Sequence, residues 1–374
     1  MDEEVTSVNS RELVCAAMRR QPTPRIPVMP QITIDAPVRL YASEYGGDWL
    51  DGLARVLENP ALEHEYNMRL AKDARCDGMR MFIKPDAVKI VRAGDDLIAL
   101  DPKTEERLGK INAVGGGNLV PDKPLPPVET LDEARERLEL LSRHFTDEKI
   151  DALRIARERV PDMFVAGAPG NMTMGMYNIL RGLEQGMMDL FERPDFVTAI
   201  FDLQVESVIR HAEKLLPTGV DAFYIGDPSS SPSLISPRHF KKFCLPAFQK
   251  FCTHFKDRDI LIYIHVCGNT TPILEMLADT GVDMVESLDP MGGQGVSVAD
   301  AKARIGDRVG LMGGLGTDTL DSGTPADVRA EAIQKCREGG PHGYILAAGC
   351  DVPPNTPMKN LRAMTDVAVE SQWK

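Results

Sequence analysis

The chain has 374 residues, a length that suits two domains or one α/β barrel, and it carries a formal net charge of −13 at pH 7. That charge, with no run in which Lys or Arg is concentrated, argues against nucleic acid or an anionic membrane as a partner. No stretch reaches the roughly 18 apolar residues of a membrane span, and the seven scattered cysteines do not resemble a disulfide framework, so we expect a soluble, cytoplasmic protein with reduced thiols.

Short apolar runs recur along the chain, each followed by a turn signal and then a helical pattern. They span residues 25–33, 77–83, 163–170, 220–227, 260–268, 282–289, 308–316 and 343–350. Helix-like segments include 175–191, 194–216, 238–256, 270–280, 297–305 and 324–338, and the charged stretch 130–160 indicates two solvated helices. Strands that alternate with helices are typical of a parallel sheet, so the pattern predicts a single (β/α)8 TIM barrel domain over residues 1–374.

Residues 87–113 depart from this alternation. Period-two runs flank a Gly-Asp-Asp turn there, which predicts a β-hairpin or small meander inserted into the barrel. The Gly- and Pro-rich stretch that follows, residues 115–127, is expected to be a loop.

The most informative residues are His265, Cys267 and Cys350, at the ends of the fifth and eighth predicted strands. Side chains alternate along a strand, so His265 and Cys267 face the same way. The carboxyl ends of all barrel strands meet at one mouth, which brings Cys350 toward them. One imidazole and two thiols suit Zn²⁺, with a fourth position left for an acid, water or substrate. The alternative is a satisfied core histidine with two inert buried cysteines.

Acidic residues also follow the predicted strands. Glu286 comes after the strand next to the His/Cys pair, and we predict that it approaches the metal as a fourth ligand; the alternative is a carboxylate hydrogen-bonded to loop amides. Asp35 and Asp227 are further catalytic candidates, as the polar centre of a metal-free, decarboxylase-like enzyme.

Methionines gather at or near the predicted strand ends. Met172 and Met312, with Gly313 in the Gly-rich run 311–320, are candidates for binding a large flat apolar ligand. Met is polarizable and adaptable, and Gly lets a ligand approach the backbone closely. The alternative is that these methionines fill the barrel as ordinary core residues.

Four segments resemble the uroporphyrinogen decarboxylase superfamily: SRELVCAAMRRQPTPRIPVMP, LISPRHFKKFCLPAFQKF, IHVCGNTTPILEMLADTGVD and GYILAAGCDVPPNTPMKNLRAM. The superfamily fold is a (β/α)8 barrel. Its true decarboxylases carry an early M-R-Q-A-G-R segment, where this chain has VMPQITIDAP (28–37). His265, Cys267 and Cys350 instead match the H-x-C and distant C of its zinc methyltransferase branch. The resemblance implies that these three bind zinc and that an acid near Glu286 completes the site.

The resemblance implies methyl transfer with a corrinoid. The chain has no D-x-H-x-x-G signature, so the cobalamin is expected on a separate corrinoid protein. Our leading hypothesis is O-demethylation of a small aromatic methyl ether, with zinc as Lewis acid on the ether oxygen. The alternative is a methylcobamide:thiol reaction, for which Arg39, Arg80 and Lys84 are candidate anion-binding residues. A tetrapyrrole decarboxylase and a non-catalytic corrinoid-binding module are further alternatives.

Overall fold

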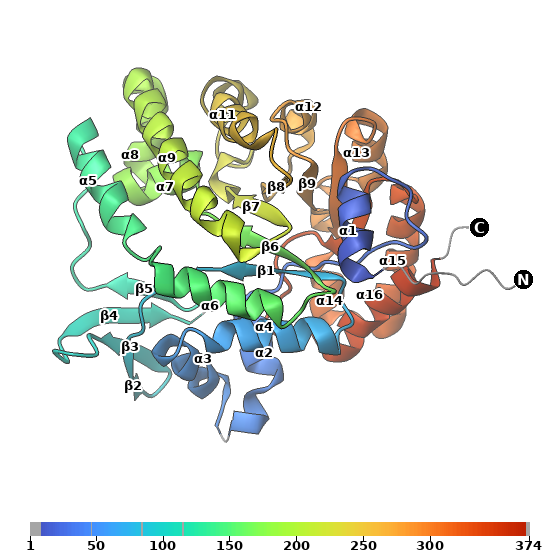
Figure 1. The fold of residues 1–374 in the computed structure, drawn as a ribbon, viewed down its shortest axis with the longest axis horizontal. Coiled ribbons are helices and arrows are strands. Elements are labelled where there is room, and N and C mark those ends of the chain that lie inside the picture. Colours follow the sequence, from blue (N-terminus) through green and yellow to red (C-terminus); the bar gives the residue numbers. More distant parts are fainter. Residues whose placement is uncertain (1–8, 46, 84, 114–115, 372–374) are drawn as a thin grey trace, which may run out of the picture.

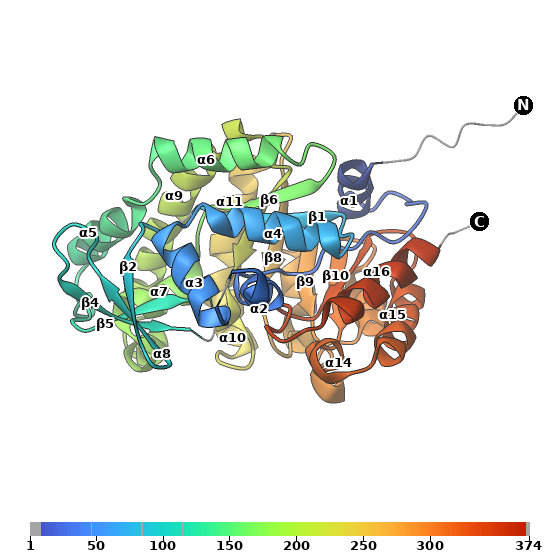
Figure 2. The same ribbon diagram turned by 90° about the horizontal axis from the view of Figure 1, so that it is seen from below.

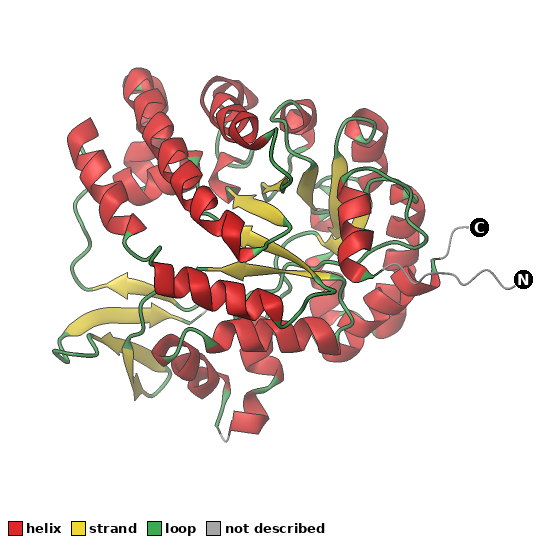
Figure 3. Ribbon diagram, viewed as in Figure 1, coloured by secondary structure: helices red, strands yellow, loops and turns green. Residues whose placement is uncertain are grey.

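The computed structural model describes the whole chain except residues 1–8, 46, 84, 114–115 and 372–374. A seven-stranded parallel sheet has the order β1-β6-β7-β8-β9-β10-β11, and helices surround it (Figure 1, Figure 3). Its strands are β1 (Gly78–Phe82), β6 (Phe164–Ala168), β7 (Ala222–Gly226), β8 (Leu261–His265), β9 (Met284–Leu288), β10 (Gly310–Leu315) and β11 (Tyr344–Ala348). Each lies within a predicted run, and the predicted α/β TIM-barrel class is confirmed. That residues 1–374 form one domain stays a prediction.

The first predicted strand, residues 25–33, is an extended segment between β11 and β1 rather than a regular strand. Val28 forms an isolated parallel bridge with Leu346, and the Leu346 amide donates to the Pro27 carbonyl at 2.9 Å. On the other side, the Asp77 amide donates to the Val28 carbonyl at 2.8 Å. The Met29 amide also donates to the Leu346 carbonyl at 3.1 Å, and a second isolated bridge joins Gln31 to Asp351. Pro27 and Pro30 have no N–H to donate, which prevents a continuous ladder. The segment nevertheless occupies the eighth position and joins the two edges of the sheet.

Helix α1 (Ser10–Met18) closes the amino-terminal end of the barrel. Its Val14, Ala17 and Met18 belong to one buried cluster with inward-facing side chains of the strands. The strand members of that cluster are Phe164, Ala166, Ala222, Tyr224, Leu261, Tyr263, Met284, Met312, Ile345 and Ala347. Because this end is filled with apolar side chains, polar chemistry is left to the opposite end, where the carboxyl ends of the strands lie.

Helices cover the outer face of the sheet. The longer ones are α2 (Asp35–Leu40), α3 (Trp49–Glu58), α4 (Leu62–Asp73), α5 (Leu131–Ser142), α6 (Asp147–Glu158), α7 (Thr173–Arg181), α8 (Leu183–Glu192), α9 (Pro194–Leu215), α11 (Leu245–Phe255), α12 (Leu274–Ala278), α13 (Val298–Ile305), α14 (Thr317–Ser322), α15 (Pro325–Gly339) and α16 (Met358–Glu370). The predicted helix 175–191 is divided between α7 and α8 at Gly182, whose φ of 80° breaks the helical path. The predicted helix 238–256 begins with a π-helical stretch, Phe240–Cys244, before α11.

The inserted segment is larger than the predicted hairpin. It is a four-stranded antiparallel sheet of β2 (Lys89–Ala93), β3 (Asp96–Leu100), β4 (Arg107–Asn112) and β5 (Asn118–Pro121). The prediction of a loop over 115–127 is therefore wrong at β5, which pairs with β4. Buried Leu97, Ala99 and Ile111 pack with Leu50 and Leu53 of α3, so the inserted sheet sits beside α3 at one side of the barrel (Figure 2).

Within the described part of the chain, no helix has the length and apolar character required to cross a membrane.

Helix α1, which closes the amino-terminal end of the barrel, should stabilise the fold without affecting the metal group at the opposite end. We expect Met18→Ala to lower the free energy of unfolding by about 2–5 kcal/mol, because it opens a cavity in a closed core, at a side chain that is 1% exposed. Met188→Ala, the same change at a 43% exposed position of α8, should stay within about 0.5 kcal/mol. Urea unfolding followed by circular dichroism measures both. Equal losses of unfolding free energy in the two variants would contradict this role of α1.

Candidate metal centre

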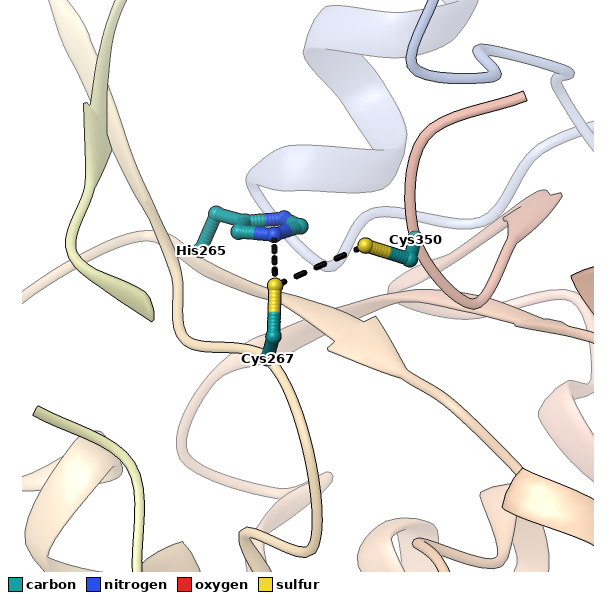
Figure 4. A group of neighbouring side chains, drawn as sticks. All are labelled: His265, Cys267 and Cys350. Atoms are coloured by element: carbon teal, nitrogen blue, oxygen red, sulfur yellow. Dashed lines mark hydrogen bonds between the residues drawn. The ribbon is translucent and has the colours of Figure 1, made fainter. Parts of the chain in front are cut away.

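His265, Cys267 and Cys350 come together at the mouth of the barrel, as the sequence predicts. His265 is the last residue of β8, Cys267 follows two positions later, and Cys350 lies two residues beyond the end of β11. Their side chains point toward one another (Figure 4). The Nε2 atom of His265 lies 2.7 Å from Cys267 Sγ, and the two sulfur atoms are 3.5 Å apart. One barrel mouth thus unites residues 83 positions apart in sequence.

The donor set fits a soft divalent ion. One ligand atom from each residue can be chosen so that all lie within 4.8 Å of one another, and no other described residues form such a group of three. A tetrahedral zinc with Zn–S bonds of about 2.3 Å separates two sulfurs by about 3.8 Å, close to the 3.5 Å seen here. Zinc binds well to imidazole nitrogen and thiolate sulfur, whereas harder cations such as Mg²⁺ and Ca²⁺ prefer oxygen ligands.

The two thiols are coupled by their contact. A hydrogen bond from Cys267, with a second from His265, lowers the pKa of Cys350. The same Cys267–Cys350 contact, together with burial, raises the pKa of Cys267. One thiol of the pair therefore loses its proton more readily than a free cysteine, which favours binding of a cation.

Glu286 lies behind the imidazole instead of beside the thiols. Its Oε2 atom is 3.1 Å from His265 Nδ1, and it does not belong to the group of candidate ligands. The reason is register: Glu286 is the ladder partner of His265 on β9, so both side chains point into the barrel at the same level. The structure thus gives Glu286 a different position from the fourth-ligand position predicted from sequence.

Arg80 of β1 stabilises the ionised form of Glu286. Its Nη2 atom lies 3.4 Å from Glu286 Oε1, and both side chains are buried. Burial opposes ionisation of Glu286, but Arg80 and His265 outweigh it and lower its pKa. An ionised Glu286 accepts a hydrogen bond from His265 Nδ1. Burial opposes protonation of His265, but its hydrogen bonds to Cys350 and Glu286 raise its pKa to about 9, so a metal at Nε2 would displace a proton from the imidazolium while Glu286 keeps the proton on Nδ1. Sequence reasoning named Arg80 only as an anion-binding candidate, because no pattern shows which strands face each other.

The surroundings of Arg80 are aromatic and polar. Its guanidinium carbon lies 4.1 Å from the centre of the Tyr224 ring. The Tyr263 hydroxyl, Arg80 Nη1 and Asp351 Oδ1 are buried and have no hydrogen-bond partner among the described residues. Burial raises the pKa of Asp351 to about 6, against the effect of Arg80. The interior beneath the metal group is therefore polar on this side of the barrel.

Asp35 and Asp227, the other predicted catalytic acids, are not part of this group. Asp35 accepts a hydrogen bond from the Gly116 amide at 2.9 Å. Asp227 accepts from the Gly175 amide at 2.8 Å and from the Ser230 hydroxyl at 2.6 Å, and burial raises its pKa to about 7. These contacts join loops to helix starts, and a catalytic role for either carboxylate stays a prediction.

The predicted cofactor-binding residues have packing roles. Met312 belongs to the apolar cluster that includes α1, and Met172 is buried in the main core. The carbonyl of Gly313 accepts from the Tyr344 hydroxyl at 2.8 Å, and a Cβ there would lie 2.8 Å from the Leu288 amide nitrogen. All three residues thus have packing contacts in the structure, and their part in binding a corrinoid stays a prediction.

Of the other two cationic candidates, only Arg39 lies within the described residues, and it is engaged away from the metal group. Arg39 stacks over the Trp49 ring at 3.6 Å and donates to Asn355 at 3.3 Å. Lys84 lies outside the described residues.

Comparisons with known proteins agree with this architecture. Residues 114–371 match the family described as Uroporphyrinogen decarboxylase (URO-D). The chain is 31% identical to the methylcobamide:CoM methyltransferase MtaA of Methanosarcina barkeri over 263 residues, which cover 69% of this chain and 74% of that protein. It is 28% identical to a uroporphyrinogen decarboxylase of Chlorobium limicola over 245 residues, or 60% and 66% of the two chains. The solved structure of a methyltransferase from Methanosarcina mazei has the same fold, with a TM-score of 0.74 at 24% identity over 97% of this chain and 99% of that one.

We expect Cys350→Ala to remove most of the bound zinc while the barrel stays folded, because the mouth carries function and the strands carry stability. Cys336→Ala is the matched control, since Cys336 is a buried free cysteine outside the group. Elemental analysis of purified proteins, with circular dichroism for the fold, measures the effect. Full zinc content in the Cys350 variant would refute the assignment.

Replacement of Glu286 should weaken zinc without changing its ligands. We expect Glu286→Gln to lower zinc affinity by about 10–100-fold, the usual effect of losing a partner that orients a ligating histidine. X-ray absorption at the zinc edge should show the same nitrogen and sulfur neighbours in both proteins. Glu275→Gln, at an exposed ion pair with Arg304, should bind zinc normally. Loss of an oxygen neighbour in the Glu286 variant would instead make Glu286 a direct ligand.

Proposed function

The chain belongs to the uroporphyrinogen decarboxylase family, and on that basis we propose that it is a zinc-dependent methyltransferase. It would transfer a methyl group between the cobalt of a corrinoid, carried by a separate protein, and a small thiol. The observation that carries the proposal is the convergence of His265, Cys267 and Cys350 at the barrel mouth. A soft nitrogen-and-sulfur site suits sulfur chemistry, and the methylcobamide:CoM methyltransferase relative supports the thiol as substrate.

The imidazole and the two thiols also favour methyl transfer over decarboxylation of a tetrapyrrole. Decarboxylation of a tetrapyrrole needs groups that hold several carboxylates, and the described barrel interior offers one buried arginine, Arg80, already paired with Glu286. Two adjacent thiols have no evident use in such a reaction. They are ligands for a metal that activates a sulfur or oxygen atom.

Bound zinc would lower the pKa of a thiol substrate, so that thiolate is the nucleophile at neutral pH. The residues of the chain prepare the site for it. His265, Cys267 and Cys350 would hold the ion, and the lowered pKa of Cys350 favours its charged form. Glu286 fixes the proton of His265 on Nδ1, and Arg80 keeps Glu286 ionised. Three protein ligands leave a fourth position for the substrate, as catalytic zinc requires.

A second candidate is removal of the methyl group of an aromatic methyl ether, with zinc acting on the ether oxygen. One observation favours it. The barrel mouth adjoins a cavity walled by Phe82, Phe145 and Tyr224, and such walls suit an aromatic ring. The small methylated substrate and the corrinoid protein are partners in both candidates.

One assay distinguishes the thiol reaction from the ether reaction. With the zinc-loaded protein, we expect methylcobalamin to lose its methyl group only when a thiol is added, and a proton to be released as the thiol binds. In the ether reaction, cob(I)alamin would be methylated by 2-methoxyphenol with no thiol present. The absorbance of the two cobalamins distinguishes these outcomes, and Cys350→Ala should abolish either. Turnover of neither substrate class with free cobalamin or a corrinoid protein would count against methyl transfer.

A further inference from the structure

The loop that follows β7 is anchored by one buried carboxylate. Asp227 comes directly after β7 and is fully buried. Its Oδ1 atom accepts from the Gly175 amide at 2.8 Å, and its Oδ2 atom accepts from the Ser230 hydroxyl at 2.6 Å. The Thr173 hydroxyl also donates to Oδ2. Asp227 thereby joins its own loop to the first turn of α7.

The backbone of α7 is shaped to admit this carboxylate. Thr173, the first residue of α7, has a φ of 48°, which is an outlier for a β-branched side chain. Residues keep such conformations only where the surrounding contacts enforce them, and they are concentrated at functional sites. Gly175 allows a close approach as well, because a Cβ there would lie 2.9 Å from Asp227 Oδ1. The fold thus accepts local strain to hold Asp227 at this position.

The anchored loop also contacts the segment that carries two of the candidate metal ligands. The Asp227 amide donates to the His265 carbonyl at 2.9 Å. Further along the loop, Ser233 lies so close to Gly268 that a Cβ there would be 2.6 Å from the Ser233 hydroxyl oxygen. Gly268 directly follows Cys267 and has a φ of 81°. The loop after β7 therefore contacts the chain on both sides of Cys267.

Short-range hydrogen bonds connect Asp227 with the far end of this loop. The Ser230 amide donates to the Asp227 carbonyl at 3.1 Å, and the Ser233 amide donates to the Ser231 hydroxyl at 3.2 Å. Ser230 and Ser231 are both buried. Because a closely packed interior transmits displacements, a shift of Asp227 would be passed along the loop to Gly268.

We propose that Asp227 is a positioning residue of the metal centre, which holds Cys267 at the distance from His265 that binding of one shared ion requires. The inference rests on the metal site of the proposed function, and it is independent of which methyl group is transferred. The carboxylate would act through the His265 backbone and through the loop against Gly268, without being a ligand. Replacing a residue that orients metal ligands typically lowers metal affinity by about 10–100-fold.

Titration of the full-length protein with Zn²⁺ against a chromophoric chelator measures zinc affinity, and the absorption spectrum of the Co²⁺-loaded protein reports the geometry of the ligands. We expect Asp227→Asn to lower zinc affinity about 10-fold and to shift the Co²⁺ absorption bands. Thr173→Val, which exchanges only the hydroxyl that donates to Asp227, should act in the same direction. Thr173→Ser keeps that hydroxyl and should retain the zinc affinity and spectrum of the parent protein.

Asp221→Asn is the matched control. Asp221 directly precedes β7, at the opposite end of the strand from Asp227, and its buried carboxylate pairs with Arg11 and Arg157. We expect Asp221→Asn to lower the melting temperature and to leave zinc affinity and the Co²⁺ spectrum unchanged, because its contacts lie away from the metal group.

Parent-like zinc affinity and Co²⁺ spectrum in Asp227→Asn would overturn the proposal. Equal losses of zinc affinity in Asp227→Asn and Asp221→Asn would also overturn it, because general destabilisation would then explain both, as would a parent protein that binds neither ion. If Asp227→Asn does not fold, the Thr173 pair decides: equal zinc affinities of the Val and Ser variants overturn the proposal, and a loss confined to Val supports it. Selective loss of zinc affinity in the variants, with no methyl transfer by the parent protein, would leave the role of Asp227 standing while the proposed function fails.

Discussion

Closure of the barrel by the segment around Val28 is the constraint on which the site depends. Without it, β11 would be a sheet edge, and a flat sheet would hold Cys350 three strands away from His265 in the order β8-β9-β10-β11. Curvature brings the strand ends to one mouth. The hydrogen bonds of Val28 and its neighbours to Leu346 and Asp77 maintain that curvature, although prolines reduce their number. The most irregular part of the barrel wall thus determines the geometry of the sulfur pair.

The charges under the mouth form a connected row. Arg80, Glu286 and His265 come from β1, β9 and β8, and each touches the next. Burying any one of them alone would be strongly unfavourable, and replacing all three by apolar side chains would often be neutral or stabilising. Stability therefore does not explain their presence. Orientation of one imidazole toward two thiols does, because the acceptor on Nδ1 determines which nitrogen is free for a metal.

Sequence periodicity was sufficient to predict seven strands and the convergence of His265, Cys267 and Cys350, since strand ends meet in any barrel. Periodicity was insufficient for features that depend on which residues of neighbouring strands pair. Glu286 was predicted as a ligand because it follows the next strand, but register places it behind the imidazole. β5 lies in a stretch whose Gly and Pro content predicts a loop.

Charge balance at the mouth depends on Asp351 as well as on the metal group. Zinc held by two thiolates and an imidazole would carry no net charge, and the Arg80–Glu286 pair adds none. Burial raises the pKa of Asp351 only to about 6, so this carboxylate is mostly ionised at pH 7. The described residues around the centre would thus carry a net negative charge, and a substrate that binds as a thiolate would add to it. Deprotonation of a thiol there would therefore depend on the zinc itself, because these described groups supply no further positive charge.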